Sequence, residues 1–303
     1  MANKSPNPIR VIFFVSSGDR LRAGWRLILH TILILVFSVV LGIIIFIPVG
    51  LLNINFDSPI ALLANEITLG ISITAATFLS RRFLDKQSME SLGLIPGIQS
   101  VIDILVGFSI TFFLMSLVYG IEFSLGWTKF EGFAWSSVPL PTLASDLGIW
   151  LLIFLLVGWQ EELLSRGYHL QTITSGSNLT IGVLFSSAVF GILHIFNPGA
   201  SWISTLGIVL AGFFLALPYI LTRQLWLSIG LHIGWNFFEG VVFGFPVSGL
   251  ETFQLLRHKV TGPEIWTGGA FGPEAGLIII PALALGSLLI FAYSKSKIRN
   301  QIK

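Results

Sequence analysis

Cysteine is absent from the 303-residue chain, and charged side chains are scarce. Without cysteine the chain forms neither disulfides nor thiolate metal sites, so any metal ion would need His, Asp, Glu or Asn ligands. Charged residues make up 11% of the chain, against about 25% in soluble domains. So few charges cannot cover the surface of a water-soluble protein of this size. The net charge of +2 is too small to indicate binding to nucleic acid.

Apolar residues are correspondingly abundant. They make up 54% of the chain, and the mean hydropathy is +0.86. A membrane-spanning helix needs about 20 mainly apolar residues. By this measure the sequence predicts eight spans, which are residues 27–52, 59–80, 99–124, 145–166, 179–196, 201–222, 225–247 and 274–294. We therefore predict an all-α, multi-pass integral membrane protein of the cell membrane.

Basic residues are distributed unevenly between the predicted loops. With eight spans and the N-terminus inside, only Lys129, Arg257 and Lys259 of the 17 Lys and Arg residues fall outside. Because Lys and Arg are enriched in cytoplasmic loops, this bias predicts that both termini are cytoplasmic. The apolar run 11–15 is too short for a signal peptide. Residues 1–26 are therefore predicted to be a cytoplasmic leader.

The remaining organisation of the chain is simple. Residues 125–144 and 248–273 are predicted to be long loops on the outer side, rich in Trp, Gly and Pro. We find no internal repeat, linker or low-complexity segment. The sequence therefore predicts one integral membrane domain over residues 1–303.

Ionisable residues cluster near the end of the fourth predicted span. Ionisable groups inside a bilayer are costly and are candidates for function. Glu162 and Arg166 are four residues apart, so they can pair on one helix face. Glu161 lies about 100° around the helix from Glu162. One carboxylate can thus be committed to Arg166 while Glu161 stays free to act as a general base.

Two further predicted spans carry histidines with a second motif residue one turn away. Phe190 precedes His194 by four residues in the fifth span, and can pack beside it. His232 precedes Asn236 by four residues in the seventh span. This spacing puts the imidazole and the carboxamide on one face of the helix.

These three motifs resemble the CAAX protease and bacteriocin-processing family of intramembrane proteases, which includes the type II CAAX prenyl endopeptidase. The family pattern is Glu-Glu-x-x-x-Arg, then Phe-x-x-x-His, then His-x-x-x-Asn/Asp, and all three stand here in order and without departure. The resemblance covers residues 140–245, which we predict to be the catalytic core on spans four, five and seven. Residues 268–274 also look like the segment before the last helix in bacterial members.

The resemblance implies a role for each motif residue. Glu161 would activate water with help from His194. His232 and Asn236 would stabilise the oxyanion of a tetrahedral intermediate, which is usually the largest contribution in acyl transfer. The supporting residues would be Glu162, Arg166 and Phe190. The implied partners are a peptide or protein substrate and the lipid bilayer.

The family resemblance leaves open whether a metal ion takes part. Glu161, His194 and His232 form a set of ligands that Zn²⁺ accepts. The pairing of His232 with Asn236 suits hydrogen-bond donation instead, so we favour a metal-free Glu/His mechanism. Other intramembrane proteases are disfavoured, since the sequence has no His-Glu-x-x-His, Gly-x-Ser-Gly or Gly-x-Gly-Asp motif.

Simpler interpretations of the same residues remain open. Glu161, Glu162 and Arg166 can be a charged helix end, and the histidines can be interhelical hydrogen-bonding groups. A proton-coupled transporter would use the same buried groups as a proton relay. A membrane scaffold or bacteriocin-immunity protein of the same fold would not need them for catalysis.

Four more ionisable residues belong to no motif. Three of them are interpreted as interhelical or interfacial contacts: His30, Glu66 and Asp103. Glu239 shares a helix face with His232 and is a candidate to support the site.

Overall fold

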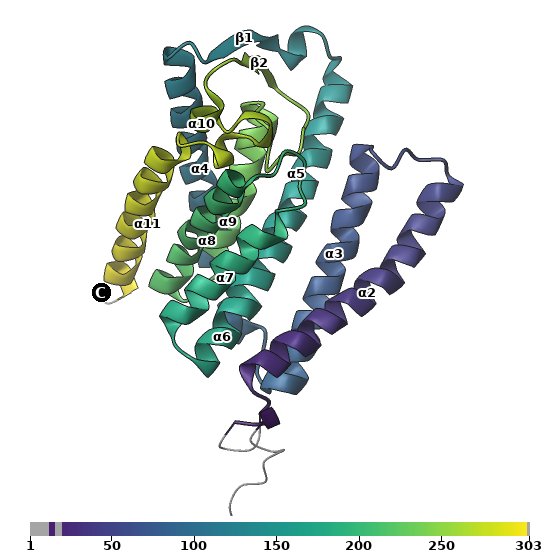
Figure 1. Ribbon diagram of the computed structural model, residues 1–303, viewed down its shortest axis with the longest axis vertical. Coiled ribbons are helices and arrows are strands. Elements are labelled where there is room, and N and C mark those ends of the chain that lie inside the picture. The colour runs from purple at the N-terminus through teal and green to yellow at the C-terminus, as the bar shows by residue number, and fades with distance from the viewer. Residues whose placement is uncertain (1–11, 16–19, 302–303) are drawn as a thin grey trace, which may run out of the picture.

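The long apolar runs of the sequence form long helices in the computed structural model of the protein, which describes residues 12–15 and 20–301, with side chains up to residue 297 (Figure 1). The main helices are α2 (Ala23–Leu51), α3 (Pro59–Leu79), α4 (Ile98–Ser124), α5 (Leu140–Glu162), α6 (Leu170–Gly176), α7 (Leu179–Leu193), α8 (Trp202–Thr222), α9 (Trp226–Asn236) and α11 (Ile279–Gln301). Each predicted span therefore corresponds to a helix.

Within the described residues, six helical segments are long and apolar enough to cross a membrane. They are Ala23–Leu51, Pro59–Asp85, Ile98–Ser124, Leu140–Gly176, Trp202–Thr222 and Ile279–Lys297. The two other predicted spans correspond to α7, with 15 residues, and to α9, with 11 residues. The protein is thus a mostly helical membrane protein. The count of eight spans and the cytoplasmic termini stay predictions, and basic residues in 1–11 and 298–303 lie outside the described side chains.

The structure also contains a short β-sheet, which the prediction of an all-α protein did not include. Strands β1 (Thr128–Phe133) and β2 (Leu256–Val260) pair antiparallel at one end of the bundle (Figure 1). Both strands lie in segments predicted to be loops. Each has only five or six residues, with charged side chains among the apolar ones. Neither strand shows strict alternation of apolar and polar residues, so only their mutual pairing identifies them.

His258 in β2 lies against aromatic rings. Its ring centroid is 4.7 Å from that of Phe245 and 5.7 Å from that of Tyr119. Burial lowers the pKa of His258 to about 4. The unfolded chain therefore binds a proton near pH 6.5 that the folded protein does not bind until about pH 4.

We expect this difference to make stability pH-dependent. Stability contributed by neutral His258 is complete above about pH 6.5 and is lost as the pH falls towards about 4. The unfolding temperature of the detergent-solubilised protein should drop between pH 7.5 and pH 4.5. In His258→Phe this drop should be smaller by several degrees. An equal drop in both proteins would show that His258 does not contribute.

Helix α9 lies in the centre of the bundle, and close backbone approaches hold it there. Every residue from Leu227 to Asn236 is buried. A Cβ atom at Gly230 would collide with the backbone of Ile104 in α4, and one at Gly158 in α5 would collide with the Ile233 side chain of α9. Glycine at these crossings lets the helices approach closely. The approach fixes the depth of α9, and hence of His232, relative to α5.

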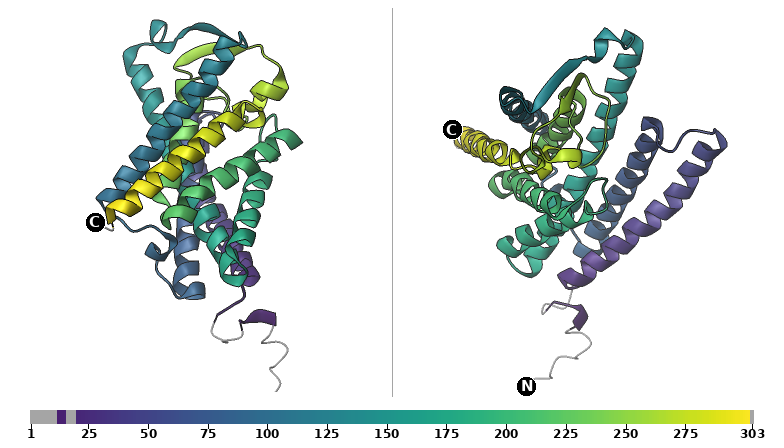
Figure 2. Two further views of the ribbon diagram at one scale, coloured as in Figure 1. Left: turned by 90° about the vertical axis from the view of Figure 1, so that its left-hand side faces the viewer. Right: turned by 45° about the horizontal axis from the view of Figure 1, so that its top comes forward.

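The α2–α3 pair stands to one side of the other helices (Figure 2). Only Arg26, His30 and Val49 of α2 are buried, and apolar side chains such as Leu35 and Val39 are exposed. Such a bare apolar helix fits a lipid environment. The α2–α3 pair therefore depends on a small number of contacts to hold its position.

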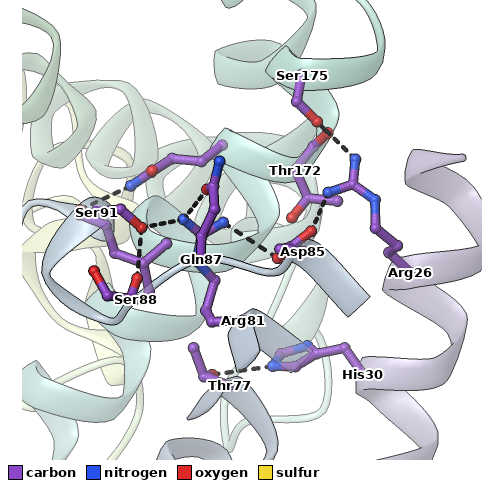
Figure 3. A network of polar contacts seen from close by, with 12 residues as sticks. Arg26, His30, Thr77, Arg81, Asp85, Gln87, Ser88, Ser91, Thr172 and Ser175 are labelled. Atoms are coloured by element: carbon purple, nitrogen blue, oxygen red, sulfur yellow. Dashed lines mark hydrogen bonds and ion pairs between the residues drawn. The ribbon is translucent and has the colours of Figure 1, made fainter. Parts of the chain in front are cut away.

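A buried polar network ties the α2–α3 pair to α6 (Figure 3). Arg26 is the last residue of the predicted leader, but α2 begins at Ala23, so Arg26 lies inside the helix and is buried. It forms an ion pair with Asp85 and donates 2.7 Å to Ser175 Oγ. Arg81 also pairs with Asp85, at 3.2 Å. One carboxylate thus balances two buried guanidinium groups.

His30, from the same helix, has the structural role predicted for it. Its Nε2 atom lies 3.0 Å from Thr77 Oγ1, and its ring stacks on Tyr168 with centroids 3.9 Å apart. This contact joins α2 to α3 and to the helical segment after α5, away from the cavity described below.

Asp85→Asn is expected to destabilise the protein strongly, by about 3 kcal/mol or more, because it leaves two buried cations without an anion. Asp57→Asn is the matched control, since Asp57 is exposed in the turn just before α3, the helix that continues to Asp85. The measurement is thermal unfolding in detergent. Equal unfolding temperatures for the two variants would contradict the role given to Asp85.

Candidate active site

Glu162 is the most completely bound acid of the predicted site. It ends α5, and its side chain is fully buried. Its Oε1 atom accepts from Arg166 Nη1 at 2.7 Å and from His232 Nδ1 at 2.8 Å. The predicted pairing of Glu162 with Arg166 is thus confirmed, and the same carboxylate also holds His232.

Arg166 extends this connection to two more helices. Its Nη2 atom donates to the Gly212 carbonyl of α8 at 3.0 Å, and its guanidinium lies 4.3 Å from the Phe190 ring centroid in α7. The residues after Glu162, Leu163–His169, form a π-helix. Such π-segments are frequent at functional sites. Arg166 therefore contacts α5, α7 and α8 directly, and it is linked to α9 through Glu162 and His232.

Glu161, in contrast, remains free. Its side chain is 28% exposed, but its Oε2 atom is buried and has no hydrogen-bond partner among the described residues. Oε2 lies 3.9 Å from His194 Nε2 and 3.7 Å from His232 Nε2. The two adjacent carboxylates thus differ as the helix geometry predicts: one is committed to Arg166 and one faces two imidazoles.

The second nitrogen of each histidine fixes the orientation of its ring. His194 is the C-terminal cap of α7, and its Nδ1 lies 2.8 Å from the Phe190 carbonyl oxygen. A carbonyl only accepts, so His194 Nδ1 carries the proton and neutral His194 has a lone pair at Nε2. His232 Nδ1 likewise donates to Glu162. His232 therefore carries a proton at Nε2 only when the ring is an imidazolium.

Glu161, His194, His232 and Asn236 line one cavity of about 230 Å³. Asn236 is the last residue of α9 and is 6% exposed. The other lining residues are mostly apolar; most come from α3, α5, α7, α8 and α9, and the rest from the loops between helices. The structure thus brings all four predicted catalytic residues to one space large enough for a water molecule and part of a peptide.

The wall of this cavity includes residues that sequence reasoning did not assign to the site. Glu274 accepts from Trp235 Nε1 at 3.2 Å and from the Ser248 backbone N–H at 2.8 Å. Asn197, three residues after His194, donates to the Ser248 carbonyl at 3.0 Å. Glu274 thus fixes the turn at residues 247–250, which closes one side of the cavity. In the sequence, Glu274 is a single acid within a Gly- and Pro-rich segment, and this pattern alone does not assign it to the site.

The acids outside the motifs separate into two groups. Glu66 of α3 makes a predicted interhelical contact, since it accepts from Gln160 of α5, and it also lines the cavity. Asp103 does not; it pairs with Lys297 at 2.6 Å and so joins α4 to α11, as predicted for an interhelical contact. Glu239 is fully buried behind the site, and neither of its carboxylate oxygens has a partner in the described part of the chain.

The candidate zinc ligands are slightly too far apart in this arrangement. Donor atoms of a tetrahedral Zn²⁺ site, with bonds of about 2.0–2.2 Å, lie about 3.3–3.6 Å from one another. Glu161 Oε2 is 3.7 Å and 3.9 Å from the two imidazole nitrogens. Over the described ranges, no group of three His, Asp or Glu side chains is arranged to hold a metal ion. Glu161, His194 and His232 do not form a zinc site as they stand.

Comparison with known proteins identifies the segment that carries this site. Residues 143–238 match the family model described as type II CAAX prenyl endopeptidase Rce1-like. The matched residues are less than half of the chain, but they include all three motifs. No curated protein and no solved structure matches. The family match confirms the resemblance indicated by the motifs: residues 143–238 form an Rce1-like segment of the CAAX protease and bacteriocin-processing family.

Proposed function

We propose that the protein is an intramembrane endopeptidase of the cell membrane, in which water activated at Glu161 hydrolyses a peptide bond. One observation carries the proposal: a free carboxylate faces two imidazole Nε2 atoms in a cavity that Asn236 also lines. The Rce1-like match over these residues supports a peptidase.

Glu161 is the proposed general base. It accepts a proton from a water molecule held between its Oε2 atom and His194 Nε2. Because His194 keeps its proton at Nδ1, its Nε2 atom accepts a hydrogen bond from this water. The hydroxide attacks the peptide carbonyl carbon. The proton held by Glu161 then passes to the leaving amine as the C–N bond breaks.

His232 and Asn236 are the proposed oxyanion donors. Asn236 donates through its carboxamide N–H. His232 donates at Nε2 as an imidazolium, because its Nδ1 proton is engaged with Glu162. Glu162 and Arg166 thus act as positioning residues, since they hold His232 and do not contact the substrate. Loss of one such donor typically costs about 10²–10³-fold in kcat.

The test is cleavage of a peptide library by the purified protein in detergent, with products identified by mass spectrometry. One arm contains peptides with a farnesylated C-terminal CaaX sequence, which is the substrate class that the matched family is named for. We expect cleavage by the wild type and none by Glu161→Ala or His194→Ala. An active Glu161→Ala variant would contradict the proposal. Activity that survives a zinc chelator would exclude the metal-dependent version.

A further inference from the structure

Glu66 places a second carboxylate in the wall of the proposed catalytic cavity. It lies on α3, is 8% exposed, and lines the same cavity as Glu161. Asn65 Nδ2 donates to its Oε1 atom at 3.0 Å, and the Gln160 side-chain amide donates to its Oε2 atom. Gln160 directly precedes Glu161. The Glu66 carboxylate is therefore held at a fixed place beside the proposed base.

Both donors to Glu66 are neutral amides. No ion pair among the described residues includes Glu66, whereas the buried acids Asp85, Asp103 and Glu162 each have a basic partner. The cavity wall contains no Lys or Arg. A carboxylate in an apolar cavity is stabilised by a cationic partner, and Glu66 has none, because the proposed imidazolium of His232 is bonded to Glu162 instead.

A groove beside the cavity is acidic as well. The groove and the cavity share two lining residues, Leu62 and Leu250. Its wall contains the carboxylates of Asp57, Asp146 and Glu251 and no basic residue. None of the three takes part in an ion pair within the described ranges. A peptide segment that lies in this groove beside the cavity meets negative charge.

We infer that Glu66 is a specificity-determining residue that selects peptides with a Lys or Arg side chain near the cleaved bond. The inference rests on the proposed function and names its substrate class. A basic side chain in the cavity pairs with Glu66, and the acidic groove favours the approach of a cationic segment. A peptide with Glu at the same position is repelled by Glu66. Glu66 therefore selects against acidic peptides as well as in favour of basic ones.

A purely structural role for Glu66 makes a different prediction. If Glu66 only holds Gln160 beside Glu161, its replacement changes the cleavage of all peptides by one factor. If Glu66 binds a substrate cation, its replacement changes basic peptides alone. Glu66→Gln separates the two roles, because glutamine carries no charge but keeps one oxygen that accepts from Gln160; the oxygen that accepts from Asn65 is lost.

The experiment uses fluorescent peptides in which one Lys is moved through each position, each paired with a norleucine analogue of nearly the same shape. Binding is measured on detergent-purified Glu161→Ala protein, so it does not depend on hydrolysis, and kcat/KM is measured on the wild type. We expect one position, relative to the cleaved bond, at which Lys is preferred over norleucine by at least about tenfold. In Glu66→Gln the preference should fall to within about threefold. Glu122→Gln is the matched control, since this buried acid bonds Thr128 outside the cavity and should leave the preference unchanged.

The outcomes distinguish this inference from the proposed function. Cleavage of Lys and norleucine peptides at equal rates at every position would overturn the role of Glu66 and leave the peptidase proposal standing. If no peptide is cleaved, the peptidase proposal fails, and the binding measurement still decides whether Glu66 selects a cation. Equal loss for Lys and norleucine peptides in Glu66→Gln would assign Glu66 a structural role only.

Discussion

Glu161→Gln is expected to lower kcat/KM for peptide hydrolysis by about 10²–10⁴-fold, the usual contribution of a general base. Glutamine keeps the shape of the side chain but cannot accept a proton from water. Glu161 forms no short hydrogen bond with the described residues, and its side chain is 28% exposed. Its replacement should therefore leave the unfolding temperature in detergent almost unchanged.

The neighbouring acid is the control for this prediction. Glu162→Gln removes the same charge one residue away, but from a fully buried carboxylate bonded to Arg166 and His232. It should lower the unfolding temperature as well as the activity. Full activity in Glu161→Gln, or equal loss of stability in the two variants, would contradict the division of roles between the two carboxylates.

Arg166→Met should destabilise the protein by about 3–5 kcal/mol, because it removes the guanidinium that neutralises the buried Glu162 carboxylate and leaves His232 as its one remaining hydrogen-bond partner among the described residues. The change also removes the hydrogen bond to the Gly212 carbonyl and the contact with the Phe190 ring. The measurements are thermal unfolding and the yield of monodisperse protein in detergent. Hydrolysis should fall too, because Arg166 no longer fixes the position of Glu162, which holds His232.

Two further variants separate charge from packing. Arg82→Met removes an exposed arginine and should have little effect. The double variant Glu162→Gln with Arg166→Met should be less destabilised than Arg166→Met alone, since it removes both charges of the buried Glu162–Arg166 ion pair. A double variant at least as unstable as Arg166→Met would show that packing, rather than the ion pair, dominates at this position.

Much of the fold follows from hydropathy, because apolar runs of sufficient length form helices in a bilayer. The runs near residues 27–52 and 99–124 were located to within a few residues of α2 and α4. The paired strands β1 and β2 were missed, because their identity depends on contacts between segments over 120 residues apart. The start of α2 was placed late, because Arg26 suggested a polar leader whereas Asp85 neutralises it.

The candidate site was predicted as far as local spacing allows. Spacing of four residues identified the Glu162–Arg166 pair, and the motif order associated His194 and His232 with Glu161. Glu66 was predicted only as an interhelical or interfacial contact, and Glu274 was not assigned to the site, because each is a single acid in its segment, without a partner at helical spacing. Only the packing of α3 and of the turn at residues 247–250 brings them to the cavity.

Hydrolysis in H₂¹⁸O tests the central claim most directly. A cleaved library peptide is incubated with the purified protein in labelled water, and the products are weighed by mass spectrometry. The wild type is expected to place one ¹⁸O atom in the new carboxyl group at the cleaved bond, and Glu161→Gln to form no labelled product. Labelled product formed by Glu161→Gln at the wild-type rate would contradict water activation at Glu161.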